Sequence, residues 1–274
     1  MAIESQLELE WLGGPSERRL RASRPGFDDL PWDSFEPRAD DAENPNLIAT
    51  RALWTNGVFT EYASAAAFSA LNIALLECQA PVDLCAAAAD FAVDELVHVS
   101  LVSRLVMTLG GATPYLADMT RIAPAPSAVA GLSPRMRAAE LAIKVSCVGE
   151  ALSLPALSAS HRGATHPLAR AVLDRLRHDE GPHAAIGHWF LAWVDPWLTA
   201  GDREYLGNVA TEAIAVYEPL WRDAHHDTVD EHYGTASFRD YMQHAVDERI
   251  VGKLAKLGIH CSTGAVDTGS ACRA

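Results

Sequence analysis

The sequence predicts an all-α protein, and three observations support this fold class. Alanine, leucine and valine dominate long stretches between Leu47 and Leu257, with few helix-breaking residues. Apolar residues in these stretches recur every three to four positions, the spacing of one helix face. Alternation of apolar and polar residues, the mark of half-buried strands, is weak throughout. With 49% apolar and 21% charged residues, the chain has the composition of a globular protein.

The expected helices come in pairs. Glycines, prolines and charges break the first part of the chain, so residues 1–46 should form an irregular N-terminal extension. Residues 47–110 predict two long helices with one turn at Pro81. Residues 135–198 predict a second pair with a turn at 161–167. Two helical hairpins are therefore expected.

Two further helices are expected near the C-terminus, at about residues 202–225 and 237–257. They complete a helical domain that spans residues 47–258. The remaining residues, 259–274, are small and polar without periodicity, which predicts a mobile tail.

Charge and cysteine content exclude several classes of partner. The formal net charge is −14, and such a chain repels polyanions, so no nucleic acid or membrane is expected as a partner. No stretch reaches the roughly eighteen uninterrupted apolar residues of a membrane helix, and residues 1–10 lack the pattern of a secretory signal. The five cysteines form no Cys-x-x-Cys pair, so reduced thiols in a cytoplasmic protein are expected.

The core-facing seam of each helix in the two hairpins is apolar except at one level. The polar residues at that level are Glu61, Glu95, His98, Glu150, Glu180 and His183. A buried carboxylate without a partner is so costly that the group would sooner be protonated. Two divalent ions would balance the four carboxylates, and neutral histidines could complete the coordination.

The positions of the glutamates along the chain support this metal site. In an antiparallel hairpin, two residues lie level when the turn is midway between them. The midpoint of Glu61 and Glu95 is position 78, beside the turn at Pro81. The midpoint of Glu150 and Glu180 is position 165, inside the second turn. Each hairpin should therefore bring its glutamates to the same height.

The sequence contains two Glu-x-x-His motifs, and this spacing places both side chains on one helix face. One such motif alone is weak evidence, because an exposed glutamate near a histidine is the commoner explanation. Two copies, each paired with a level-matched glutamate, favour a metal site. The remaining alternative is a helical protein that has kept these residues without the metal.

The residues that carry a family resemblance are Glu61, Glu95-Leu-Val-His98, Glu150 and Glu180-Gly-Pro-His183. Their pattern resembles that of the ferritin-like di-iron carboxylate proteins, over about residues 53–197. The resemblance implies an antiparallel four-helix bundle, here with additional C-terminal helices and an N-terminal extension. It also implies two iron ions, or iron with manganese, and O2 as a co-substrate.

The resemblance assigns a role to each residue of the pattern. The implied terminal ligands are Glu61 and His98 for one ion, and Glu150 and His183 for the other. Glu95 and Glu180 would bridge the two ions and act as the catalytic carboxylates.

Residues beside the motifs extend the resemblance and also depart from it. Asp94 and Asp179 precede the motifs, and in many family members this aspartate binds the histidine of the opposite motif. A solvated aspartate on the helix surface is the alternative. Gly181 and Pro182 lie inside the second motif, where proline removes a backbone donor, so a kink or bulge is expected there. Pro155 could loosen the third helix in the same way.

The chemistry that the resemblance implies is oxygen activation by a non-haem di-iron oxygenase or oxidase. Hydroxylation, N-oxygenation, desaturation and oxidative cleavage of a small organic substrate all remain open. The alternatives are a ferroxidase that handles iron without an organic substrate, and a rubrerythrin-like peroxidase, although the Cys-x-x-Cys pairs of a rubredoxin module are absent. A radical-generating subunit of the ribonucleotide reductase kind matches less well.

The expected partners follow from this chemistry. An oxygenase without its own electron-transfer module needs an external electron donor, such as a ferredoxin or a flavin reductase. The additions outside the hairpins could build a substrate pocket and the interface of a homodimer.

Overall fold

A computed structural model of the chain describes residues 4–36, 43–124, 129–222 and 237–263. These residues are mostly helical, which confirms an all-α fold. The helices and strands are β1 (Ser5–Gln6), α1 (Gly14–Ser23), α2 (Pro45–Glu77), α3 (Val82–Thr108), β2 (Leu116–Ala117), α4 (Pro134–Ala142), α5 (Ala151–Gly163), α6 (Pro167–Val194), α7 (Ala200–Tyr217), α8 (Pro219–Arg222), α9 (Phe238–Val246) and α10 (Gly252–Ala255). Two π-helical segments are η3 (Ile143–Glu150) and η6 (Asp247–Val251).

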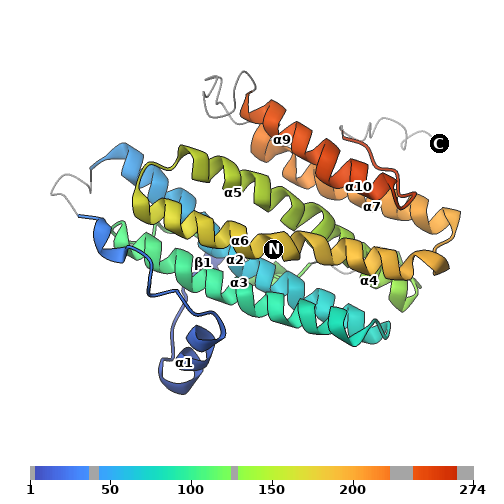
Figure 1. Ribbon diagram of the computed structural model, residues 1–274, viewed down its shortest axis with the longest axis horizontal. Helices are drawn as coiled ribbons and strands as arrows, with labels where there is room; N and C mark the ends of the chain where they lie inside the picture. The colour runs from blue at the N-terminus through green and yellow to red at the C-terminus, as the bar shows by residue number, and fades with distance from the viewer. Residues whose placement is uncertain (1–3, 37–42, 125–128, 223–236, 264–274) are drawn as a thin grey trace.

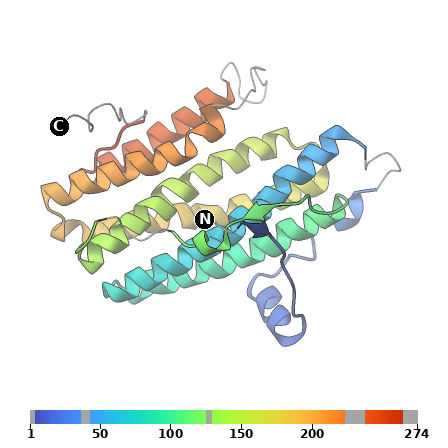
Figure 2. The same cartoon turned by 180° about the vertical axis from the view of Figure 1, so that it is seen from behind.

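The two expected hairpins are present and run along the longest axis of the molecule (Figure 1). Helix α2 packs against α3, and α6 packs against η3 and α5. In addition, α2 contacts α4, and α3 contacts α6. Helices α4, η3 and α5 follow one another as one continuous rod, so the four rods, namely α2, α3, α4–η3–α5 and α6, form a closed ring of neighbours. Helices α7, α9 and α10 form a further layer beside this ring, as Figure 2 shows from behind. The two short strands pair antiparallel, with Ser5 opposite Ala117.

The first hairpin turns where the sequence predicts it, for local reasons. Asn44 caps the start of α2, because its side chain accepts a hydrogen bond from the backbone of Asn46. At the other end of α2, Gln79 adopts a positive φ of 55°. This left-handed residue lets the backbone N–H of Ala80 donate to the carbonyl of Leu75, a Schellman-type ending. Pro81 then starts the return into α3.

The bulge expected at Gly181 and Pro182 does not form there, and the irregularity lies in the third helix, before the Pro155 expected to loosen it. Helix α6 continues through Gly181 and Pro182, both of which are exposed. Water can therefore solvate the backbone group that Pro182 leaves without a donor, and the helix does not need to break there. The irregularity is instead the π-helical turn η3, which ends at Glu150 on the neighbouring rod. Single π turns of this kind are frequent at functional sites.

Close contact between η3 and α6 explains how this π turn is held. The Ser146 hydroxyl donates to the carbonyl of His183 at 2.7 Å and accepts from the backbone N–H of Gly187 at 2.9 Å. In a regular helix the N–H of Gly187 would donate to the carbonyl of His183 four residues earlier. The Ser146 hydroxyl bonds to both of these groups and so bridges the backbone of α6 at this point. A Cβ on Gly187 would lie only 2.6 Å from Cys147 Sγ, so the approach requires glycine.

The described parts of the N-terminal extension and of the C-terminal tail contain structure that the sequence does not predict. The extension expected to be irregular contains α1, because Gly13, Gly14 and Pro15 start a helix there instead of breaking one. The expected mobile tail begins with Ile259, which is fully buried. The rest of that tail, residues 264–274, lies outside the described residues, as does the part of the expected helix 202–225 that follows Arg222.

Two helical segments, Pro45–Glu77 and Pro134–Gly163, are long and apolar enough to cross a membrane by length and composition. Core helices of water-soluble proteins pass the same test, and 56% of the apolar window in the second segment is buried inside the protein. The first carries Glu61 and the second carries Glu150, both turned toward the same acidic cluster.

The tight contact at Gly187 can be tested by substitution. Gly187→Ala should lower the free energy of unfolding by about 1–3 kcal/mol, because the new methyl group overpacks the contact with η3. Urea denaturation followed by circular dichroism measures this loss. Gly181→Ala on the same helix is the control, since a Cβ there meets nothing within 4 Å, and it should be neutral or slightly stabilising. Equal stability of the two variants would contradict the close packing described here.

Candidate metal centre

Four helical rods converge on one buried polar cluster. Helix α2 contributes Glu61, α3 contributes Glu95 and His98, the end of η3 contributes Glu150, and α6 contributes Glu180 and His183. All of these side chains are buried except that of Glu61, which is 13% exposed. The structure therefore brings all six residues expected from the sequence into one place.

The ligand atoms form two overlapping groups that could each hold a metal ion. In each group one possible ligand atom per residue lies within 4.8 Å of the others. The first group is Glu61, Glu95, His98 and Glu180, and the second is Glu95, Glu150, Glu180 and His183. Glu95 and Glu180 belong to both groups, which is the position that bridging carboxylates between two ions would occupy.

Three of the four carboxylates, those of Glu95, Glu150 and Glu180, are destabilised in their charged form. For Glu61, in contrast, the contact with His98 outweighs burial and lowers the pKa. Burial, followed by repulsion from Glu150, raises the pKa of Glu95 to about 7. Burial and repulsion from Glu180 raise the pKa of Glu150 well above its usual value. Both shifts have the same cause, namely negative charges gathered in a dry interior, and both would be relieved by a cation.

The negative charges around the cluster stabilise the protonated form of both histidines. Burial alone would lower the pKa of His183, but its contacts with the carboxylates of Asp94, Glu180 and Glu95 outweigh burial and raise the pKa to about 12. The pKa of His98 is also raised well above its usual value, because its contacts with Asp179, Glu61 and Glu95 outweigh burial. Without a metal, the cluster holds protons as its source of positive charge.

Several polar atoms at the centre of the cluster have no hydrogen-bond partner. They are both carboxylate oxygens of Glu95, Oε2 of Glu180, and Nδ1 of His98 and of His183. His183 Nδ1 lies 2.8 Å from a Glu95 oxygen but without hydrogen-bonding geometry. Buried polar atoms are nearly always satisfied, so these orphans point to a missing cation. Carboxylate oxygens with imidazole nitrogens suit iron or manganese.

Asp94 and Asp179 each contact the histidine of the opposite motif, as the resemblance implies. His98 Nε2 lies 3.3 Å from Asp179, and His183 Nε2 lies 3.4 Å from Asp94. The pKa of Asp94 is lowered to about 2, because its bonds to His183 and Arg24 outweigh the effect of burial. An ionised carboxylate accepts the Nε2–H, which leaves Nδ1 of each ring directed at the glutamates.

Aromatic rings cover the His183 side of the cluster. The ring centroid of His183 lies 4.5 Å from that of Phe91 and 5.2 Å from that of Phe68. These rings exclude water from that side, so the low-dielectric environment strengthens every interaction of the cluster.

A cavity of about 930 Å³ opens beside the cluster and was not predicted from the sequence. Glu61, Glu150 and Glu180 lie at its wall, so it reaches both groups of ligands. The rest of the lining is mostly apolar and comes from α2, residues 120–124, η3, α5 and the C-terminal helices, including Ala67, Leu152, Trp221 and Met242. Tyr217 also lines it, next to Gly149. No local pattern marks these residues, because they meet only in the folded protein.

Comparison with known proteins gives no relative for this chain. No protein family, curated protein sequence or solved structure matches it.

The cluster should bind two metal ions per chain. We expect metal-free protein to take up about two Fe²⁺ or Co²⁺ ions, because the two groups of ligands share two bridging glutamates. A Glu95→Ala, His183→Ala double variant should lose this uptake. Metal analysis after anaerobic loading measures the stoichiometry, and a Glu204→Ala, His244→Ala variant is the control. A wild-type protein that folds normally without taking up metal would make the cluster purely structural.

The metal-free protein should lose stability as pH rises above about 4.5, the usual pKa of a glutamate. Because the pKa of Glu150 is higher in the folded than in the unfolded state, unfolding releases protons in this range and is favoured by high pH. Glu150→Gln should flatten the dependence, since the neutral amide keeps the shape without titrating. Thermal unfolding across this pH range measures the effect. An equally steep fall of the unfolding temperature with pH in the variant would show that the pKa of Glu150 is not raised in the folded protein.

Proposed function

We propose that this protein is a ferritin-like, non-haem di-iron oxidoreductase that activates O2 to oxidise a small organic substrate. The observation that carries the proposal is the position of the Glu/His cluster at the wall of a large, mostly apolar cavity. A metal site for iron handling alone needs a route for ions, which polar groups would line. A cavity of about 930 Å³ whose lining is mostly apolar, although Lys144 and Arg121 also line it, suits an organic molecule better.

The fold part of the proposal rests on the ring of four rods. Helices α2 and α3, the rod from α4 to α5, and α6 contact one another in a closed ring. Their ligands project into its centre, with one glutamate from each of two rods and a Glu-x-x-His motif from each of the other two. This is the ligand arrangement of ferritin-like di-iron bundles.

Residues of the two groups would divide the metal ligation between them. Glu61 and His98 would complete one position, Glu150 and His183 the other, and Glu95 and Glu180 would bridge them. Two bound irons would supply the one-electron steps by which O2 is reduced. Iron with manganese is the alternative pair, since both metals accept this donor set.

The chain itself would bind the substrate, exclude water and hold protons. Leu152, Trp221 and Met242 would hold an apolar substrate against the carboxylate side of the cluster. The Tyr217 hydroxyl lies near Gly149 at this wall and is available as a hydrogen-bond donor to the substrate. Phe68 and Phe91 shield the opposite side at His183.

Insertion of one oxygen atom of O2 into a C–H or N–H bond leaves the other atom to be reduced to water. That reduction consumes two electrons, which an external donor such as a ferredoxin or a flavin reductase would supply, and two protons, which come from solvent. Desaturation would remove two hydrogens from the substrate and reduce O2 to water with the same donor.

A ferroxidase is the competing function, and oxygen consumption separates the two. The oxygenase should consume O2 faster when a suitable apolar molecule is added at fixed iron. A ferroxidase should respond only to further Fe²⁺. Uptake of many Fe²⁺ ions per chain, without stimulation by any organic molecule, would favour the ferroxidase.

Filling the cavity should abolish organic turnover while the metal site stays intact. Ala67 lines the cavity on α2, so Ala67→Phe should reduce substrate-stimulated O2 consumption on the order of a hundredfold by displacing the substrate. Ala52→Phe, at an exposed position of the same helix, is the matched control and should be neutral. Iron content is measured in both variants. Full turnover by Ala67→Phe would show that the cavity is not the substrate site.

A further inference from the structure

Each aspartate that contacts a histidine also contacts an arginine, but the two arginines come from different parts of the chain. On α6, Arg175 lies four residues before Asp179, and its Nε donates to that carboxylate at 2.8 Å. On α3, the residue four before Asp94 is Asp90, so the helix supplies no cation there. Arg24, from the segment after α1, takes this place and contacts both Asp94 and Asp90.

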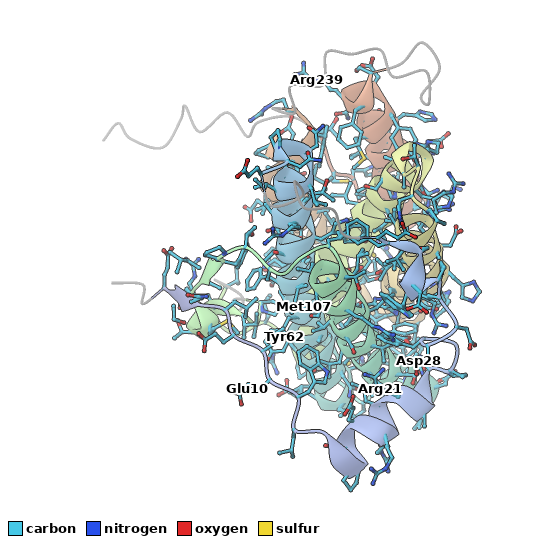
Figure 3. The ribbon with its side chains drawn as sticks, turned by 90° about the vertical axis from the view of Figure 1, so that its left-hand side faces the viewer. Glu10, Arg21, Asp28, Tyr62, Met107 and Arg239 are labelled. Atoms are coloured by element: carbon cyan, nitrogen blue, oxygen red, sulfur yellow. The ribbon has the colours of Figure 1, made fainter. Side chains whose placement is uncertain are left out.

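Residues 24–32, which we term the N-terminal strap, contact supporting residues beside both histidines of the cluster. The Pro25 carbonyl, next to Arg24, accepts a hydrogen bond from Arg175 Nη1 at 3.2 Å. The strap is held further along by Asp28, which accepts from Arg104 of α3 at 2.7 Å. Figure 3 shows Asp28 and Arg21 where this segment meets the helices. One short segment thus contacts Asp94 directly and is linked to Asp179 through Arg175.

The strap is anchored well enough to set positions. Its last residue, Trp32, is buried against side chains of α3 and α6, and the Arg104 guanidinium lies 4.1 Å from its ring centroid. The side chain of Arg24 is 19% exposed and that of Asp94 is 10% exposed. A charge-assisted contact shielded to this degree resists displacement by water better than a surface ion pair.

We propose that Arg24 is a positioning residue of the metal centre, which makes the N-terminal strap a part of that centre. Through Asp94, Arg24 fixes the ring of His183 so that Nδ1 faces Glu95 and Glu180. Arg175 does the same for His98 through Asp179. The inference rests on the metal site of the proposed function, but not on its oxygenase activity.

Titration of metal-free protein with Co²⁺ tests this role, because visible absorption reports the coordination at each step. Arg24→Gln should weaken one of the two Co²⁺ equivalents about 10–100-fold, the usual effect of losing a residue that supports a ligand. Arg175→Gln should weaken the other equivalent, and the double variant should weaken both. In a His98→Ala background, Arg24→Gln should still weaken the remaining site, whereas in a His183→Ala background it should have no effect.

Arg21→Gln is the matched control, because Arg21 lies three residues away and contacts Glu17 and Asp28 but neither aspartate beside the motifs. It should bind both equivalents like the wild type. If Arg24→Gln does not fold, Arg24→Lys is tested in its place. Lysine keeps the positive charge but cannot contact Asp90 and Asp94 with a planar guanidinium. It should therefore weaken the same Co²⁺ equivalent, but by a smaller factor. Unchanged Co²⁺ binding in the Arg24 variants, or equal loss in Arg21→Gln, would overturn the proposal. A wild type that binds no Co²⁺ would refute the metal centre and this inference together.

Discussion

The gathering of four buried glutamates at one level of the helical core is the constraint on which the rest of the structure depends. Charge of one sign at this density is stable only with positive charge among it. In the metal-free protein that charge is carried by protons on the two histidines, whose pKa values are raised. The orphaned ligand atoms show that protons satisfy the cluster only in part, whereas two cations would satisfy it fully.

The helices around this cluster are adapted to it in ways that ordinary packing does not require. The π turn of η3 ends at Glu150, and Ser146 within it bonds to the backbone of α6 next to His183. Gly187 permits this approach. A distortion in one rod is therefore tied directly to a ligand on the next, so the two ligands cannot move independently.

The segments outside the two hairpins have separate tasks. The N-terminal strap contacts Asp94 on α3 and Arg175 on α6, on the histidine side of the cluster. The C-terminal helices lie against α5 and η3, and their Trp221 and Met242 help to enclose the cavity on the carboxylate side. One addition thus supports the metal ligands, and the other shapes the space where a substrate would bind.

The sequence by itself determined the helices of the two hairpins, both hairpin turns and the six residues of the cluster, because helical periodicity and level-matched spacing are local properties of a chain. It also indicated the two aspartates, which adjoin the motifs, but it did not indicate α1. The tertiary structure alone decided that the bulge lies in η3 and not at Pro182, since that depends on which side of α6 faces water. It alone brought Arg24 to Asp94 across seventy positions and assembled the cavity. These contacts join residues far apart in the chain, and no periodicity encodes them.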